Sequence, residues 1–269
     1  QVEIVVIKTS GDRIQDRPLS EVGGKGLFTK EIEAALLAGS IDCAVHSMKD
    51  VETHLPEGLS IACLLPRQDV RDAFISLRWA TLAALPVGAR LGTSSLRRQA
   101  QVRRLRPDLA VGTLRGNVGT RLRKLDEGAV EATLLAVAGL NRLGLSRHIT
   151  AVMATDVMLP AVAQGAIGIE IRSGDERMPR LLAPIDDPAT ATAIACERAF
   201  LAGLDGSCKT PIAGLAEVGG GRIRFRGLIL SPDGAESHAT AREGTETDAM
   251  RLGADAATEL LSRAGPRFL

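Results

Sequence analysis

Aromatic side chains are scarce in this chain of 269 residues, which has no Tyr, one Trp and five Phe. Proteins that bind single-stranded nucleic acid stack bases on exposed aromatic rings, so the composition does not favour this class. Long apolar runs are also absent, because no stretch approaches the roughly 18 consecutive apolar residues of a membrane span. We therefore expect neither a nucleic-acid partner nor a membrane partner.

Cysteine and histidine are few and scattered. The cysteines at positions 43, 63, 196 and 208 form no CxxC motif and no disulfide-framework spacing. The histidines at 46, 54, 148 and 238 match no metal-ligand pattern, so we expect no metal site. Reduced thiols in a cytoplasmic protein are the simplest interpretation. The chain has no signal-peptide pattern and opens on Gln, from which we expect the native protein to have an earlier segment.

Positive charge is concentrated in one stretch. Between Arg97 and Lys124 there are nine basic residues and one acidic residue, Asp108, although the formal net charge of the whole chain is only +1. Arginine dominates the stretch, and its planar guanidinium suits bidentate binding of carboxylate or phosphate. The pattern predicts a polyanion site, while the near-neutral net charge counts against duplex nucleic acid as the ligand.

Strand and helix patterns alternate through the first two thirds of the chain, which predicts an α/β fold with parallel sheets and right-handed crossovers. Helices are expected at 29–38, 95–105 and 117–127. The strands expected beside them lie at 2–7, 41–46, 59–65, 71–77, 89–92, 109–113, 132–136 and 166–171.

Two segments, 65–70 and 159–165, have the composition of linkers. If both are linkers, the chain leaves a first domain (1–68 and 166–185), builds an inserted, arginine-rich second domain (69–165), and returns. The remainder, 186–269, predicts a C-terminal α+β domain with helices at 188–204 and 247–263 around three strands.

The basic stretch crosses two junctions at which a strand ends and a helix begins. In the first, Ser94 or Ser95 can cap the helix that carries Arg97 and Arg98. The second carries Arg115 and Arg121 among glycines. Free N–H groups at helix starts bind anions, and both junctions should lie at the carboxyl edge of one sheet. We assign these four arginines to a binding site, and three others, at 103, 104 and 106, to a solvated helix surface.

Three further motifs have two interpretations each. Lys25 lies in a glycine loop without P-loop spacing, which either presents the lysine to an anion or is an ordinary turn. Lys49 and Asp50 follow a buried strand and form either a surface pair or part of the cationic site, where a carboxylate could stabilise a developing cation. Cys208, which follows Gly206 and Ser207 and precedes Lys209, is either a reactive thiol or an incidental exposed one.

Taken together, seven phrases in this order resemble the porphobilinogen deaminase family. They span nearly the whole chain, and seven in register are far more specific than any one alone. The phrases are Val22-Gly-Gly-Lys-Gly-Leu-Phe28, His46-Ser-Met-Lys-Asp-Val51, Gly92-Thr-Ser-Ser-Leu-Arg-Arg-Gln99, Leu114-Arg-Gly-Asn-Val-Gly-Thr-Arg121, Leu135-Ala-Val-Ala-Gly-Leu-Asn-Arg-Leu-Gly-Leu145, Leu159-Pro-Ala-Val-Ala-Gln-Gly165 and Gly206-Ser-Cys-Lys-Thr-Pro211.

The resemblance implies a fold and an activity. Two lobes built like periplasmic binding proteins would hold the active-site cleft between them, with the C-terminal domain beside them. The enzyme would be a monomer that condenses four porphobilinogen molecules head to tail on a dipyrromethane primer. It would release ammonia and the linear tetrapyrrole hydroxymethylbilane in tetrapyrrole biosynthesis. The primer, a cofactor made from two substrate units, would be attached to Cys208 by a thioether.

The resemblance also implies roles for individual residues. Asp50 would be the catalytic carboxylate, stabilising positive charge on pyrrole nitrogens and assisting proton transfer. The cofactor would be held by Cys208, Ser47, Lys49, Thr93, Ser95, Arg97 and Arg98. The substrate would be bound by Arg115, Arg121, Arg142, Lys25 and Gln164.

The chain departs from the family pattern in three phrases. Ala163 stands where the family commonly has Gly, and Glu52 and Ser207 also differ from the usual residues. The main alternative is a non-enzymatic, two-lobed protein that binds carboxylates or other anions. Such a protein would share the fold and the arginines but would have no use for Cys208 or Asp50.

Overall fold

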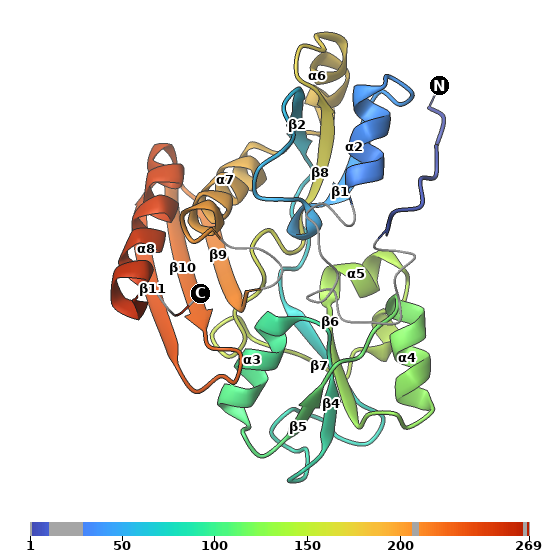
Figure 1. Ribbon diagram of the computed structural model, residues 1–269, viewed down its shortest axis with the longest axis vertical. Coiled ribbons are helices and arrows are strands. Elements are labelled where there is room, and N and C mark those ends of the chain that lie inside the picture. The colour runs from blue at the N-terminus through green and yellow to red at the C-terminus, as the bar shows by residue number, and fades with distance from the viewer. Residues whose placement is uncertain (1, 11–28, 206–209, 266–267, 269) are drawn as a thin grey trace.

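The computed structural model describes residues 2–10, 29–205, 210–265 and 268, and builds them around three sheets (Figure 1). Sheet A has the strand order β1-β8-β2, and both neighbouring pairs are antiparallel. The 3₁₀ turn η1 follows β1 directly. The elements of this lobe are α2 (Lys30–Leu37), β1 (Ala44–Ser47), η1 (Met48–Asp50), β2 (Leu59–Leu64), β8 (Ile167–Arg172), α6 (Arg177–Leu182) and η3 (Ala183–Ile185).

The strands of sheet B come, in sequence, between β2 and β8 of sheet A. Their order in the sheet is β5-β4-β6-β3-β7. Strand β4 is parallel to β5 and β6, whereas β3 is antiparallel to β6 and β7. The elements of this lobe are β3 (Asp72–Ile75), β4 (Arg90–Gly92), α3 (Leu96–Leu105), β5 (Ala110–Gly112), α4 (Val118–Asp126), β6 (Ala132–Ala136), α5 (Val137–Arg142), η2 (Ser146–His148) and β7 (Ala151–Val152).

Two sequence-based expectations were wrong. The residues at 2–7 form no strand, and Val2 and Ile4 are 89% and 85% exposed, so their β propensity has no sheet edge to satisfy it. The expectation that the sheets are purely parallel was also wrong. Strand β8 begins where the second linker enters the lobe, at the edge where β1 and β2 end, and must therefore run against both. Strand β3 likewise begins at the edge where β6 ends, since Asp72 pairs with Ala136.

The two linker segments, 65–70 and 159–165, lie side by side. The amide of Gln68 donates to the carbonyl of Gly165 at 3.1 Å. Gly165 has a φ of +87°, and a Cβ there would come within 2.6 Å of the Gln68 carbonyl oxygen. Only glycine permits this close approach, so the crossing between the lobes depends on that residue.

Sheet C is antiparallel, with the order β11-β10-β9, and two long helices, α7 and α8, cover one face (Figure 1). Phe200 of α7 and Phe225 of β10 meet in its core, with ring centroids 4.9 Å apart. The elements are α7 (Pro188–Gly203), β9 (Ile212–Gly219), β10 (Arg222–Leu230), β11 (Ser237–Thr245), η4 (Glu246–Asp248) and α8 (Ala249–Ala264).

One buried carboxylate ties the C-terminal unit to both linkers. Glu197 of α7, fully buried, accepts two hydrogen bonds from the guanidinium of Arg67 at 2.6 and 3.0 Å. It also accepts from the amides of Ala163 and Ala216 at 2.6 and 2.7 Å. Every lone-pair direction of this carboxylate is thus occupied by a donor from the first linker, the second linker or β9.

The expected fold class is confirmed: an α/β protein with two lobes and a C-terminal α+β unit. The residue boundaries of the three domains stay a prediction.

Candidate active site

The first basic junction runs from β4 into α3. Ser95 is the N-cap residue, and its side chain accepts from the amide of Arg98 at 3.4 Å. Ser94, the alternative cap, instead donates to the carbonyl of Leu114 at 2.6 Å and so joins the two junctions. Thr93 is fully buried, and its hydroxyl accepts from the amide of Ser95 at 3.3 Å. Both junctions are thereby held at one edge of sheet B.

Arg97 and Arg98 point inward, toward a carboxylate that sequence reasoning missed. Arg97 contacts both oxygens of Asp72, at 2.7 and 3.2 Å. Arg98 donates twice to Oδ1 of the same residue, at 3.0 and 2.7 Å. Both guanidiniums are nearly inaccessible, with side chains 4% and 6% exposed. Although burial opposes ionisation, the two arginines hold the pKa of Asp72 far below its usual range.

Asp72 also reaches the second linker. Gln164, which is 1% exposed, donates from Nε2 to Asp72 Oδ1 at 3.0 Å and to the carbonyl of Val70 at 2.7 Å. The direction of β3 explains this placement, because that strand starts at the edge where β4 and β6 end. A signal was present in the sequence, since Asp72 directly follows a linker segment, but nothing local identified its partners 25 and 26 residues away.

The second junction runs from β5 into α4. Asn117 caps the helix by accepting from the amide of Thr120 at 2.8 Å. Gly116 has a φ of +114°, and a Cβ there would lie 2.5 Å from the Thr120 side chain, so the turn requires glycine. Arg121 donates from Nε to the carbonyl of Gly116 at 2.7 Å, and Lys124 donates to the carbonyl of Arg115 at 3.2 Å.

The second junction carries positive charge that has no described counterion. Nη1 of Arg115 is buried without a hydrogen-bond partner among the described residues. Burial, reinforced by the charges of Arg98 and Arg115, lowers the pKa of Arg121 to about 10, with Asp50 acting in the opposite direction. Clustered cations of this kind are stabilised by an anion, and carboxylates suit guanidinium groups.

The end of β1 faces these arginines from the other lobe. Burial lowers the pKa of Lys49, and the charges that act on this lysine include Asp50, which raises the pKa, and Arg98, which lowers it. Ser47 and Lys49 are half-buried, whereas Asp50 is exposed. Within the described part of the chain, the side chain of Asp50 forms no hydrogen bond or ion pair. The structure thus brings Asp50 and Lys49 into the electrostatic range of Arg98 and Arg121.

Among the described residues, no hydrogen bond or ion pair joins Arg142 to this group. Arg142 is exposed in the last turn of α5. Lys25 and Cys208 lie outside the described residues. The roles of individual residues toward cofactor and substrate stay predictions.

The assignment of three arginines to a solvated helix surface was wrong for Arg106 and incomplete for Arg103. Arg106 pairs with Asp108 at 2.6 Å and donates to the carbonyls of Leu82, Ala83 and Leu85. Arg103 donates to the carbonyl of Pro232, in the turn between β10 and β11, at 2.7 Å. Arg104 is exposed. The carbonyls that hold Arg103 and Arg106 come from loops distant in sequence.

The three described cysteines are unpaired. Cys63 and Cys196 are buried and Cys43 is half-buried, and burial raises the pKa of each thiol, that of Cys196 to about 12. Burial therefore disfavours the reactive thiolate form of each of these thiols. Among the described residues, no group of three or more His, Cys, Asp or Glu could hold a metal ion, and no helix is long and apolar enough to cross a membrane.

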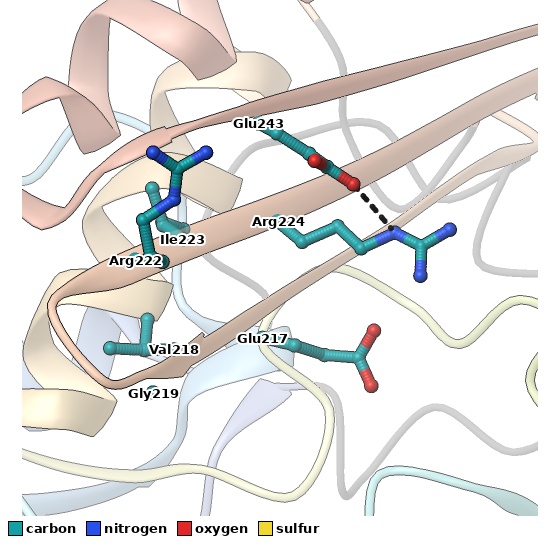
Figure 2. Close-up of a pocket in the computed structure, with 7 residues that line it drawn as sticks. All are labelled: Glu217, Val218, Gly219, Arg222, Ile223, Arg224 and Glu243. Carbon is teal, nitrogen blue, oxygen red and sulfur yellow. Dashed lines mark ion pairs between the residues drawn. The ribbon is translucent and has the colours of Figure 1, made fainter.

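A separate pocket lies on sheet C and is lined by residues of β9, β10 and β11 (Figure 2). Three of its four charged side chains already have an opposite charge nearby: Arg224 lies 3.6 Å from Glu243, and Glu217 lies 3.6 Å from Arg226. We do not assign the active site here. The pocket is lined by Glu217, Val218, Gly219, Arg222, Ile223, Arg224 and Glu243.

Comparison with protein-family models gives two matches that cover most of the chain. Residues 1–180 match the model described as "Porphobilinogen deaminase, dipyromethane cofactor binding domain". The chain belongs to the porphobilinogen deaminase family. Residues 191–262 match the model of the "Porphobilinogen deaminase, C-terminal domain". The resemblance found in the sequence is thereby confirmed, as is the membership of this chain in a family of enzymes with a dipyrromethane cofactor.

Similar curated proteins agree. The chain is 62% identical over 268 residues to porphobilinogen deaminase of Nitrobacter hamburgensis, covering 100% of this chain and 85% of that protein. It is 58% identical over 271 residues to the chloroplastic porphobilinogen deaminase of Pisum sativum, covering 99% and 73%. Among solved structures, a putative methionine-binding lipoprotein from Bacillus subtilis matches with a TM-score of 0.41 and 12% identity, covering 58% of this chain and 74% of that one.

Proposed function

We propose that this protein is a porphobilinogen deaminase that works through the group formed by Arg98, Arg115, Arg121, Lys49 and Asp50. It would condense four porphobilinogen molecules head to tail and release hydroxymethylbilane and ammonia. The observation that carries the proposal is that the charge of one carboxylate, Asp50, acts on Arg121, which like Arg115 has no counterion among the described residues. Family membership supplies the reaction, and the site supplies charges of the kind that this reaction needs.

The substrate carries an acetate and a propionate, so its binding needs more than one guanidinium. Arg115 and Arg121 are suited to this role because one has a buried nitrogen without a described partner and the other has its charged form destabilised. A bound carboxylate would relieve both conditions. Arg142, Gln164 and Lys25 complete the substrate residues by family resemblance. Gln164 would act indirectly, since its amide nitrogen already bonds Asp72 and Val70.

Asp50 would act on the reacting ring. As ammonia leaves porphobilinogen, positive charge develops over the pyrrole nitrogen, and a fixed carboxylate beside that N–H stabilises it. The same carboxylate can accept or return the proton that moves at the aminomethyl group. Asp50 has no described side-chain partner to compete for it, so both functions are available to the exposed oxygens.

The dipyrromethane cofactor supplies, when bound, the pyrrole carbon to which the first substrate is joined. Ser47, Lys49 and Ser95 present polar groups near the arginines, and with Cys208 as the point of thioether attachment they would hold the cofactor carboxylates. Thr93, Arg97 and Arg98 are buried and already have partners. Arg98 still acts on Lys49 and Arg121 through its charge, so it adds to the positive field without leaving Asp72.

We also propose that the protein acts as a monomer in the cytoplasm and binds neither nucleic acid nor membranes. The free thiols of Cys43, Cys63 and Cys196 match the state that a reducing compartment maintains. Light scattering coupled to size exclusion tests the oligomeric state, and a dimer mass would remove the monomer proposal.

Intact-protein mass spectrometry tests the function. Protein purified from a haem-making host should exceed the mass of the bare chain by two linked pyrrole units, and Cys208→Ala should abolish the adduct. Cys43→Ala and Cys63→Ala are matched controls that should keep it. A bare mass with a freely alkylated Cys208 would instead support a non-enzymatic anion-binding protein.

A further inference from the structure

The carboxylate of Asp50 is positioned by its backbone. Asp50 is the last residue of η1, and its exposed side chain forms no hydrogen bond or ion pair within the described residues. Its direction therefore depends on how firmly the turn around it is held. Two backbone bonds define that turn: the amide of Met48 donates to the carbonyl of Ala166 at 3.0 Å, and that of Val51 donates to the carbonyl of Met48 at 3.3 Å.

Residues on both sides of Asp50 are packed against the C-terminal unit. Met48 and Val51 are 1% and 6% exposed and belong to one apolar cluster with Ile194 and Phe200 of α7. The first residue of the turn and the residue after it are therefore fixed by packing. Apolar packing does not provide hydrogen-bond donors for the backbone carbonyls of Val51 and the two residues after it.

Arg198 of α7 satisfies those carbonyls. It donates to the carbonyls of Val51, Glu52 and Thr53 at 3.4, 2.7 and 3.0 Å. Its pKa is lowered by burial, while the charge of Glu170 acts in the opposite direction. The guanidinium presents its N–H groups in a fixed geometry. Its hydrogen bonds to three consecutive carbonyls therefore restrict the orientation of that backbone segment.

We propose that Arg198 is a positioning residue for Asp50: it clamps the segment directly after the catalytic carboxylate and so fixes where that carboxylate points. The inference rests on the proposed role of Asp50. Lysine could reproduce the clamp only in part, since an ammonium is a compact charge without the fixed fork that reaches three carbonyls. The neighbouring residue on α7, Glu197, holds the linkers, so one helix fixes both the hinge and the carboxylate.

The test compares Arg198→Gln and Arg198→Lys with Arg226→Gln. Arg226 is the matched control because its guanidinium also reaches from the C-terminal unit to a lobe, contacting the carbonyl and hydroxyl of Thr155 at 3.4 and 2.8 Å. Arg198→Gln should lower kcat by about 10- to 100-fold with little change in KM, the size expected when a reacting group is misplaced. Arg198→Lys should recover part of the loss, and Arg226→Gln should keep kcat.

Hydrogen exchange gives a readout that does not depend on activity. In Arg198→Gln the amides of residues 48–53 should exchange faster, while those of α7 and sheet C keep their protection. Faster exchange over the whole chain, or KM and kcat changing together with loss of cofactor mass, would mean a merely structural role and would overturn the inference. If Arg198→Gln does not fold, the same readings on Arg198→Lys decide the matter.

A double variant separates this inference from the proposed function. In an Asp50→Asn background, Arg198→Gln should reduce turnover no further, because the group it positions is already gone. Near-normal turnover in Asp50→Asn alone would remove the proposed role of Asp50. A strongly impaired Asp50→Asn beside a fully active Arg198→Gln would overturn the positioning role and leave the proposed function standing.

Discussion

Arg97 and Asp72 form a buried, bidentate ion pair, with nitrogen–oxygen distances of 2.7 and 3.2 Å and side chains that are 4% and 0% exposed. Arg98 joins the same carboxylate, so a single negative charge organises two arginines at the start of α3. Removing that charge would leave two buried cations without compensation.

Asp72→Asn should therefore be strongly destabilising, by roughly 3–5 kcal/mol at pH 7, the range for breaking a buried ion pair. The pKa of Asp72 is lowered in the folded state, so its contribution is complete above the ordinary value of 3.8 and is lost as pH falls below that value. Denaturant unfolding of both proteins between pH 7 and pH 3 should show the difference shrinking below about pH 4. A small, pH-independent difference would contradict this account of the pair.

Arg121→Gln should stabilise the protein while weakening substrate binding. The pKa of Arg121 is lowered to about 10, so its charged form is disfavoured by the fold at every pH below that value. Loss of the charge should raise the free energy of unfolding by about 1 kcal/mol after solvent screening, although the bond to Gly116 is also lost. Thermal unfolding checks the first effect, and a raised KM the second.

Arg123→Gln is the control for that variant. Arg123 lies on the same helix but is exposed, 3.7 Å from Glu127. The Arg123→Gln substitution should change neither the melting temperature nor KM appreciably. A destabilised Arg121→Gln protein would show that its charge is not under strain in the unliganded site.

The second linker contains a residue in an unfavourable conformation. Ala163 has a φ of +61°, which an L-residue rarely adopts, while its amide is fixed by Glu197 at 2.6 Å. Ala163→Gly should relieve that strain and stabilise the protein by up to about 1 kcal/mol, less the entropy that glycine adds to the unfolded chain.

Gly165→Ala is the contrasting change in the same linker. Its φ is +87°, and the new Cβ would lie 2.6 Å from the carbonyl oxygen of Gln68. We expect a loss of roughly 1–3 kcal/mol, measured by denaturant unfolding beside Ala163→Gly. Equal effects of the two substitutions would contradict the account of this crossing.

The features that sequence patterns predict best are local ones. The start of the helix after Ser94 or Ser95 follows from capping chemistry, and the structure has Ser95 as the cap. The helix expected to begin at 117 is also confirmed. The Asp50 position at the end of β1 follows from a short apolar strand and the residues after it. Each of these features depends on neighbours in the chain.

The features that the sequence does not reveal depend on long-range pairing. Asp72 meets Arg97 only because β3 runs against β6, and Glu197 meets Arg67 across 130 residues. The residues at 2–7 illustrate the converse: they have strand propensity but no strand, because propensity does not supply a pairing edge. Ala163 shows a third limit, since its positive φ is imposed by the linker and by Glu197.

The turnover of Asp50→Asn tests the central claim most directly. The variant should retain the melting temperature and the cofactor mass of the parent protein, because Asp50 is exposed and has no described side-chain partner. Its kcat for hydroxymethylbilane formation should fall by about 100-fold or more, as expected when a group that stabilises developing charge is removed. A kcat within about twofold of the parent protein, with the cofactor attached, would contradict the account, since removing a transition-state interaction must lower kcat.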